Sequence, residues 1–145
     1  MVQERTLSLI KPNAVDAQHI GEIIHRFESN QLRIIGMKMC QLSQQKAEGF
    51  YAIHRHKPFF RHLIDFIISG PIVLLVLEGE DAIAKNRRLM GHVDPVLAEP
   101  QTIRKDFGQT ITANGIHGSD CVSNAALEIR YFFAETELYP HSLSS

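Results

Sequence analysis

The chain has 145 residues, of which 44% are apolar and 21% charged, and its formal net charge is −1. The length fits one domain with a single core, and we expect one domain over residues 1–145. The composition excludes an intrinsically disordered chain. The even charge balance argues against a dedicated nucleic-acid or membrane-surface binder, which normally carries a basic excess.

The N-terminus and the cysteines bear on the compartment. Residues 1–5 lack the basic start, apolar stretch and cleavage site of a secretory signal. The longest apolar run, residues 72–77, is far too short to span a membrane. Cys40 and Cys121 have neither zinc-site nor redox-pair spacing. We therefore expect a cytoplasmic protein with two free thiols, with one disulfide as the alternative.

Strand and helix patterns alternate in the first half of the chain. Gly36 lies inside an apolar, alternating segment and indicates a bulge. Ser43 can cap a short helix, and Pro58 suits the first turn of another. The predicted elements are a strand over 6–10, a helix over 19–30, a strand over 32–42, and helices over 43–51 and 58–68.

The second half continues the alternation with shorter elements. A continuously apolar strand over 72–77 is followed by a helix over 80–90, an aperiodic loop over 92–101 and a short helix over 102–107. A long loop in a compact domain is usually functional. This order indicates helices packed on a sheet, either α/β or α+β.

A last helix is predicted to begin at Ser119-Asp120. Its apolar positions are expected to face the core, and the polar tail from Glu135 is expected to be loosely ordered or to form a subunit contact. The residues predicted to face inward are Val122, Ala125, Ala126, Ile129, Phe132 and Phe133.

Several familiar motifs are absent, and one is a chance match. The chain has no Walker A loop, no G-x-G-x-x-G and no H-E-x-x-H. Asp106-Phe107-Gly108 matches the metal-binding triplet of protein kinases, but the Gly-rich loop and the H-R-D catalytic loop are missing. We interpret His54, His56 and His62 as a solvated basic corner, with metal binding as the minor alternative.

The segment from Asn114 to Asp120 is the strongest chemical signal in the chain. His117 lies between glycines just before a predicted helix, where a substrate group can approach closely. Backbone N–H groups at a helix start favour an anion, so the segment suits a phosphate beside an imidazole. The alternative is a surface-loop histidine whose neighbour Ser119 only caps a helix.

The chain resembles nucleoside diphosphate kinases of the short bacterial type. The resemblance is carried, in order and without gaps, by residues 4–12 (ERTLSLIKP), 49–51 (GFY), 57–60 (KPFF), 69–71 (SGP), 99–100 (EP), 102–104 (TIR), 106–107 (DF) and 114–120 (NGIHGSD). It implies an α+β fold: a ferredoxin-like βαββαβ sandwich in which helices cover a four-stranded antiparallel sheet.

The implied reaction moves the terminal phosphoryl group of a nucleoside triphosphate to a nucleoside diphosphate, with little base specificity, and so maintains NTP and dNTP pools. The resemblance implies a ping-pong mechanism through a phosphohistidine at His117. It assigns Glu128 to orient the imidazole ring, and it places the hydroxyls of Tyr51 and Ser119 beside it. Lys11 completes the implied catalytic set.

The resemblance also implies how the nucleotide is held. Lys11, Arg87 and Arg104 match the cations that bind the phosphates, and phosphoryl transfer depends on such charge neutralisation. Asn114, with Lys11, matches the residue that holds the sugar hydroxyls. Phe59 matches the ring that stacks on the base, which is a contact without base specificity.

Cofactor and partners follow from the same resemblance. Mg²⁺ is expected to be held mainly by the nucleotide phosphates, with Asp120 at most an indirect ligand through water. The family forms homo-oligomers, tetramers or hexamers built from dimers. No membrane and no dedicated nucleic-acid partner is expected.

The chain departs from the family pattern mainly in one turn. Residues 90–95 read MGHVDP where MGATNP is usual, so Val93 replaces a threonine that contacts phosphate and Asp94 adds a negative charge. His92 could supply a replacement donor. Asn13 and Ala113 replace a usual aspartate and a common arginine. We expect an active enzyme with weakened nucleotide affinity; a regulatory nucleotide-binding module without turnover is the alternative, and a moonlighting role in interaction is a third.

Overall fold

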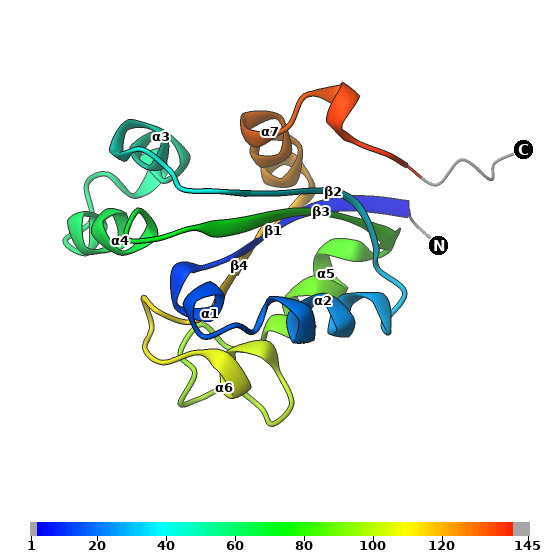
Figure 1. The fold of residues 1–145 in the computed structure, drawn as a ribbon, viewed down its shortest axis with the longest axis horizontal. Coiled ribbons are helices and arrows are strands. Elements are labelled where there is room, and N and C mark those ends of the chain that lie inside the picture. The colour runs from blue at the N-terminus through cyan, green and yellow to red at the C-terminus, as the bar shows by residue number, and fades with distance from the viewer. Residues whose placement is uncertain (1–2, 141–145) are drawn as a thin grey trace, which may run out of the picture.

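The structure is a computed structural model that describes residues 3–140. Its centre is one antiparallel sheet of four strands in the order β2-β3-β1-β4 (Figure 1). The strands are β1 (Gln3–Ile10), β2 (Arg33–Cys40), β3 (Ile72–Glu80) and β4 (Ile116–Gly118). This is the ferredoxin-like α+β arrangement, and it decides between the two fold classes that periodicity left open.

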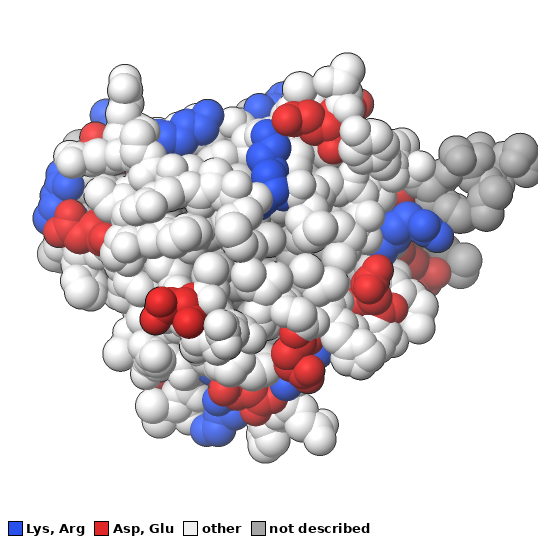
Figure 2. All heavy atoms as spheres, viewed as in Figure 1, with Lys and Arg blue, Asp and Glu red and all other residues white. Residues whose placement is uncertain are grey.

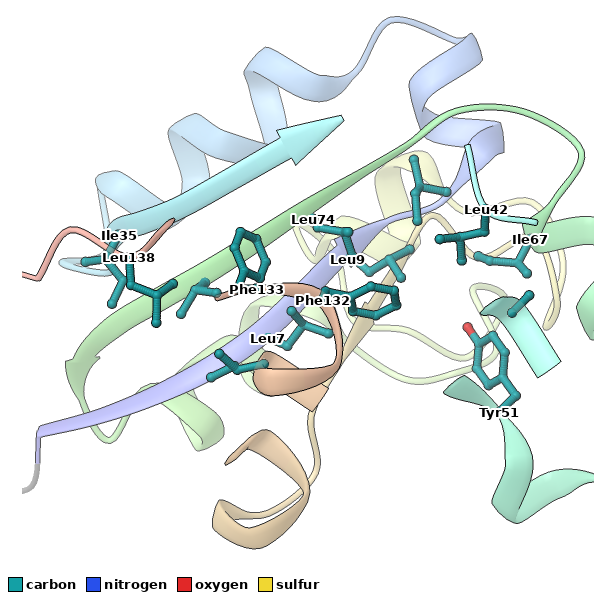
Figure 3. Packing of buried hydrophobic residues seen from close by; sticks show 14 of the residues in the cluster. Leu7, Leu9, Ile35, Leu42, Tyr51, Ile67, Leu74, Phe132, Phe133 and Leu138 are labelled. Carbon is teal, nitrogen blue, oxygen red and sulfur yellow. The ribbon is translucent and has the colours of Figure 1, made fainter. Parts of the chain in front are cut away.

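Helices cover both faces of the sheet, as Figure 1 shows. The face toward α1, α2, α5 and α6 buries Ile23, Phe27, Leu75 and Ile103. The opposite face buries Leu7, Leu9 and Leu74 against α7 and the α3–α4 pair (Figure 3). The helices are α1 (Pro12–Asp16), α2 (Ile20–Glu28), α3 (Gln44–Phe50), α4 (Phe60–Ile67), α5 (Ala82–Met90), α6 (Ile103–Phe107) and α7 (Val122–Phe132), with 3-10 turns η1 (Ala52–His54) and η2 (Glu135–Glu137).

Local signals account for several boundaries. The Ser43 side chain accepts a hydrogen bond from the Lys46 backbone at the start of α3, and Thr102 does the same for Lys105 at the start of α6. The pairing of β2 with β3 shifts register between Ile34 and Gly36, so the predicted bulge is confirmed. Two short elements were missed: α1 and β4 have too few residues to show periodicity.

The C-terminal part of the chain corrects two predictions. Val122 is 64% exposed and Ala126 is also exposed, so the predicted inward face of the last helix is wrong at these positions. Within α7 only the stripe Ala125, Ile129 and Phe132 is buried, because at 3.6 residues per turn Val122 and Ala126 lie to one side of this stripe. Val122 and Ala126 instead line an open groove.

The tail is ordered where it is described. Leu138 is buried against Phe133 and Ile35 in the core (Figure 3). The Tyr139 N–H donates to the Ile35 carbonyl at 2.7 Å, so residues 135–139 are not loose, contrary to the first expectation. The final residues of the predicted tail, 141–145, lie outside the described part. None of the described helices is long and apolar enough to cross a membrane.

Candidate active site

His117 lies on β4 directly opposite Leu9 of the central strand β1. Its Nε2 is 3.1 Å from Oε1 of Glu128 on α7, and among residues 3–140 its Nδ1 has no partner. A carboxylate accepts, so Nε2 carries the proton and Nδ1 keeps its lone pair. The arrangement leaves the Nδ1 lone pair available to attack an electrophile.

Glu128 is itself held from a second side. The Ser119 hydroxyl donates to the same Oε1 at 2.8 Å and accepts from the Leu7 N–H at 3.3 Å. Ser119 is fully buried, and the residue at the start of α7 is Cys121, which makes no side-chain cap. The alternative in which Ser119 caps the helix is therefore wrong. Ser119 joins β1 to the carboxylate that faces the imidazole.

Two aromatic rings fix the imidazole laterally. The edge-to-face contact with Phe50 has a centroid distance of 5.2 Å and an interplanar angle of 77°. Tyr51 makes a second such contact at 6.3 Å. Phe50 was missed at the sequence level because nothing local shows that a ring at the end of α3 meets β4.

Lys11 and Arg104 are the buried cations of this region. Lys11 is 6% exposed, and its Nζ donates to the Thr112 carbonyl at 3.3 Å. Arg104 is 7% exposed and donates to the carbonyls of Gly91 and Ile116, at 3.1 and 2.9 Å. Among residues 3–140 neither forms an ion pair. Buried unpaired charge is costly, so this part of the site is built for an anion.

The cost of burying these charges also appears in the pKa values of Lys11 and Arg104. Burial and the neighbouring Arg104 lower the pKa of Lys11 to about 7. Burial and the nearby Arg87 lower the pKa of Arg104 to about 10. Arg87 extends from α5 toward the same place, where its Nη1 lies 3.5 Å from the Gly118 carbonyl. The three predicted phosphate cations therefore converge next to β4.

Unpaired polar atoms mark where a ligand would bind. Within residues 3–140 the buried Tyr51 hydroxyl has no hydrogen-bond partner, and burial, followed by the charge of Glu128, raises its pKa, so it stays protonated. Asn114 donates to the Val93 carbonyl at 3.0 Å while its Oδ1 has no partner. Buried polar atoms are normally hydrogen-bonded, so these atoms are candidates to meet a substrate.

Phe59 is an exposed ring at the edge of the site. It is 47% exposed, directly before α4. The His54 ring lies 5.8 Å from it, and Lys57 Nζ lies 5.6 Å from its centroid. His56 and His62 are exposed, and no group of three potential metal ligands occurs among residues 3–140.

The turn over residues 90–95, where the sequence departs from the family pattern, is held together by its own side chains. His92 Nδ1 accepts the Asp94 N–H at 2.9 Å, and Asp94 Oδ1 accepts the Val96 N–H at 3.0 Å. The Asp94 carboxylate is thus engaged within its own turn. Val93 presents an apolar, half-exposed side chain where the family threonine offers a hydroxyl. Asn13 donates to the Ala113 carbonyl at 3.0 Å, which ties α1 to the loop before β4.

The carboxylates near His117 suit a magnesium ion that arrives bound to substrate phosphates better than one coordinated entirely by protein side chains. Asp120 is exposed, and a hydrogen bond from Asn124 lowers its pKa, so it is ionised beside Arg87. One carboxylate can hold Mg²⁺ that keeps most of its waters and phosphate ligands.

Comparisons with known proteins agree with this geometry. A sequence model described as nucleoside diphosphate kinase matches residues 4–138. The nucleoside diphosphate kinase of Thiobacillus denitrificans is 58% identical over 139 residues, covering 96% of this chain and 98% of the relative.

Solved structures give the same result. The Aquifex aeolicus nucleoside diphosphate kinase superposes with a TM-score of 0.93 at 40% identity, covering 94% of this chain and 99% of that one. The Halobacterium salinarum nucleoside diphosphate kinase, solved in complex with CDP, has a TM-score of 0.93 at 39% identity, covering 99% and 95%. The chain belongs to the nucleoside diphosphate kinase family, and its activity is phosphoryl transfer between nucleoside tri- and diphosphates.

Proposed function

We propose that this transfer passes through a phosphohistidine formed at Nδ1 of His117. The observation that carries the proposal is the Glu128 carboxylate on Nε2, which leaves Nδ1 unprotonated beside Lys11, Arg87 and Arg104. Nδ1 attacks the terminal phosphorus, the bond from that phosphorus to the bridging oxygen breaks, and the diphosphate leaves. The proton stays on Nε2, where the carboxylate stabilises the ring's new positive charge.

The second half-reaction reverses the first with another diphosphate. A terminal oxygen of the incoming diphosphate attacks the phosphorus, and the bond to Nδ1 breaks. The three cations and the neutral Tyr51 hydroxyl neutralise and orient the phosphate oxygens in both directions. One site serves donor and acceptor in turn, which is a ping-pong mechanism.

The rest of the nucleotide binds along the exposed side of this cluster. Phe59 stacks on the base, while Asn114 and Lys11 hold the sugar hydroxyls. A stacked ring accepts any common base, so specificity for the base is low and the reaction supplies both NTP and dNTP pools. The CDP complex of the Halobacterium salinarum relative supports nucleotide binding at such a site. Val93, which lacks a hydroxyl, weakens the affinity.

Mg²⁺ is the proposed cofactor, and the wider setting follows from the family. When bound, the ion neutralises phosphate oxygens and fixes their geometry. Asp120 would contact it through water.

Residues 1–145 form one kinase domain in a cytoplasmic homo-oligomer, a tetramer or hexamer, without a membrane or nucleic-acid partner.

Labelling tests the intermediate. The protein is incubated with γ-labelled ATP and Mg²⁺, and bound label is expected to be acid-labile, alkali-stable and removable by a diphosphate of a different base. His117→Ala should take up none. Retained label in that variant would move the nucleophile elsewhere, and ATP binding without any label would favour the regulatory module that has lost turnover.

A further inference from the structure

We propose that Arg26, Asp106, Phe107 and Gly108 form a clasp that positions Arg104 and Asn114 for nucleotide binding. The inference rests on the proposed function of these two residues. It gives a role to the Asp106-Phe107-Gly108 triplet, which as a kinase motif is a chance match. We call these four residues the α2–α6 clasp. They act as positioning residues, because within residues 3–140 none of them makes a side-chain hydrogen bond, ion pair or ring contact with His117, Glu128 or Ser119.

Arg26 on α2 is the centre of the clasp. Its Nη2 donates to Asp106 Oδ2 at 2.7 Å, and its Nη1 donates to the Gln101 carbonyl at 3.2 Å. One guanidinium thereby holds both ends of the short helix α6, since Gln101 precedes it and Asp106 lies in its last turn. The Arg26 side chain is only 20% exposed, so this pair is better shielded from solvent than an ordinary surface ion pair.

Phe107 adds an aromatic contact to the charged one. The Arg26 guanidinium lies 4.7 Å from the Phe107 ring centroid, and the His19 ring lies 4.4 Å from it. A cation over an aromatic face is attractive and strengthens when partly desolvated. The Phe107 carbonyl also accepts from Asn13 at 3.4 Å. The end of α6 is therefore attached to α1, to the start of α2 at His19 and to the last turn of α2 at Arg26.

Gly108 lets the backbone after α6 pack closely against Arg104, Pro95 and Asn114. A Cβ at this position would lie 2.6 Å from the Arg104 carbonyl, 2.7 Å from Pro95 and 3.0 Å from the Asn114 carbonyl. The Gly108 N–H donates to the Arg104 carbonyl at 2.9 Å. Any side chain here would push Arg104 and Asn114 apart, so glycine is required by close packing.

The clasp matters because α6 has little stability of its own. It contains five residues, and isolated helices of this length do not persist in water. Arg104, its second residue, is a buried cation without an ion pair among residues 3–140, which favours outward movement when no phosphate is bound. Contacts on the opposite side of α6 are needed to oppose that movement. Loss of the clasp contacts lowers the fraction of molecules in the conformation that binds nucleotide, and the affinity for nucleotide falls in proportion.

The test compares Arg26→Met and Asp106→Asn with the double variant in steady-state kinetics. Methionine keeps the apolar contact with Phe107, and asparagine keeps the shape of Asp106. Each single variant should raise KM for both nucleotides about tenfold while kcat stays within about threefold, because only the competent fraction changes. The double variant should lie within about twofold of Arg26→Met, because Arg26→Met already removes the ion pair that Asp106→Asn breaks. Arg26→Lys, which keeps the positive charge, should raise KM less than Arg26→Met does.

The matched control removes an arginine–carboxylate pair elsewhere. Arg5 Nε on β1 lies 3.1 Å from Glu78 Oε2 on β3. Neither residue belongs to the proposed nucleotide site, so Arg5→Met should leave KM unchanged. At saturating concentration, phosphoramidate, a phosphoryl donor without a nucleoside, should label His117 to the same final extent in wild type and clasp variants, because the clasp does not contact His117.

Three results would overturn the clasp: unchanged KM in the single variants, kcat falling as much as KM rises, or effects that multiply to about a hundredfold in the double variant. A failure of the proposed function looks different, because the wild type itself would then take up no label at His117.

Discussion

The proposed nucleophile and the proposed phosphate-binding region lie next to each other but are built differently. His117 lies on strand β4, Glu128 lies on helix α7, and Ser119 lies between these two elements; each has a protein partner. Lys11, Arg104 and Asn114 lie on short or irregular segments and keep unpaired charges or buried polar atoms. The first region is complete without substrate, whereas the second is completed by it. Chemistry at His117 and affinity for nucleotide should therefore respond separately to mutation.

The largest effect is expected from the group that orients the nucleophile. Glu128→Gln keeps the shape but removes the charge that stabilises the phosphorylated ring, so kcat should fall on the order of a hundredfold while KM changes little. Steady-state and single-turnover kinetics check this. An unchanged kcat would show that Ser119 and the rings suffice to orient the imidazole, and a large rise in KM would remove the distinction between the two regions.

The next effect concerns pH and belongs to the phosphate region. The pKa of Lys11 is lowered to about 7, so the free protein loses this positive charge as the pH rises through that value. Bound phosphate favours the charged form, so kcat/KM, which reports the free enzyme, should fall above pH 7 by up to about tenfold per pH unit. In Lys11→Arg the profile should flatten in this window. An identical profile in the variant would exclude Lys11 as the titrating group.

The same shift also affects folding. The unfolded chain holds a proton on Lys11 up to its ordinary pKa of 10.5, whereas the folded chain releases it near 7. The unfolded state therefore binds more protons between these values, and the Lys11 contribution to the free energy of unfolding increases with pH across that window. Denaturant titrations of the wild type and Lys11→Met at pH 7 and 9 measure this. The wild type should gain more stability than the variant, and equal gains would contradict a depressed pKa.

A smaller effect is expected from Ser119→Ala. The variant loses the 2.8 Å hydrogen bond to Glu128 and leaves that carboxylate with the imidazole alone. We expect kcat to drop about tenfold and the free energy of unfolding to fall by about 1–2 kcal/mol, since the Leu7 N–H also loses its partner. Kinetics and urea denaturation report both quantities. A stability loss with full kcat would make Ser119 purely structural.

The smallest effect is assigned to Val93→Thr. Restoring a hydroxyl adds one hydrogen bond to phosphate, worth about 1 kcal/mol, so nucleotide KM should fall about fivefold at constant kcat. Titration with a diphosphate gives the same comparison at equilibrium. If affinity is unchanged, the turn held by His92 and Asp94 already compensates for the missing hydroxyl, and the expectation of weakened binding is wrong.

Local signals predicted the parts of this molecule that short-range physics controls. The Ser43 cap, the Gly36 bulge and the buried strand β3 follow from neighbouring residues. Periodicity failed at Val122 and Ala126, because apolar spacing does not show how wide a stripe of the helix the sheet covers. It also missed β4, whose three residues are strand only through pairing with β1.

The site divides along the same line. The glycine-flanked His117 gave a local signal, and the family resemblance supplied its partners. The contact of Arg26 with Asp106 joins residues 80 positions apart, and the Phe50–His117 packing depends on the placement of α3 over β4. Such pairs depend on the completed fold, so no local pattern could have shown them.

The most direct test of the account is mass spectrometry of the protein after brief exposure to ATP and Mg²⁺, with the sample kept alkaline throughout. The account predicts one added phosphoryl group of about 80 Da on the peptide that carries His117, and its loss on adding a nucleoside diphosphate. A phosphoryl group found only on another residue, or turnover without any modified His117, would contradict it.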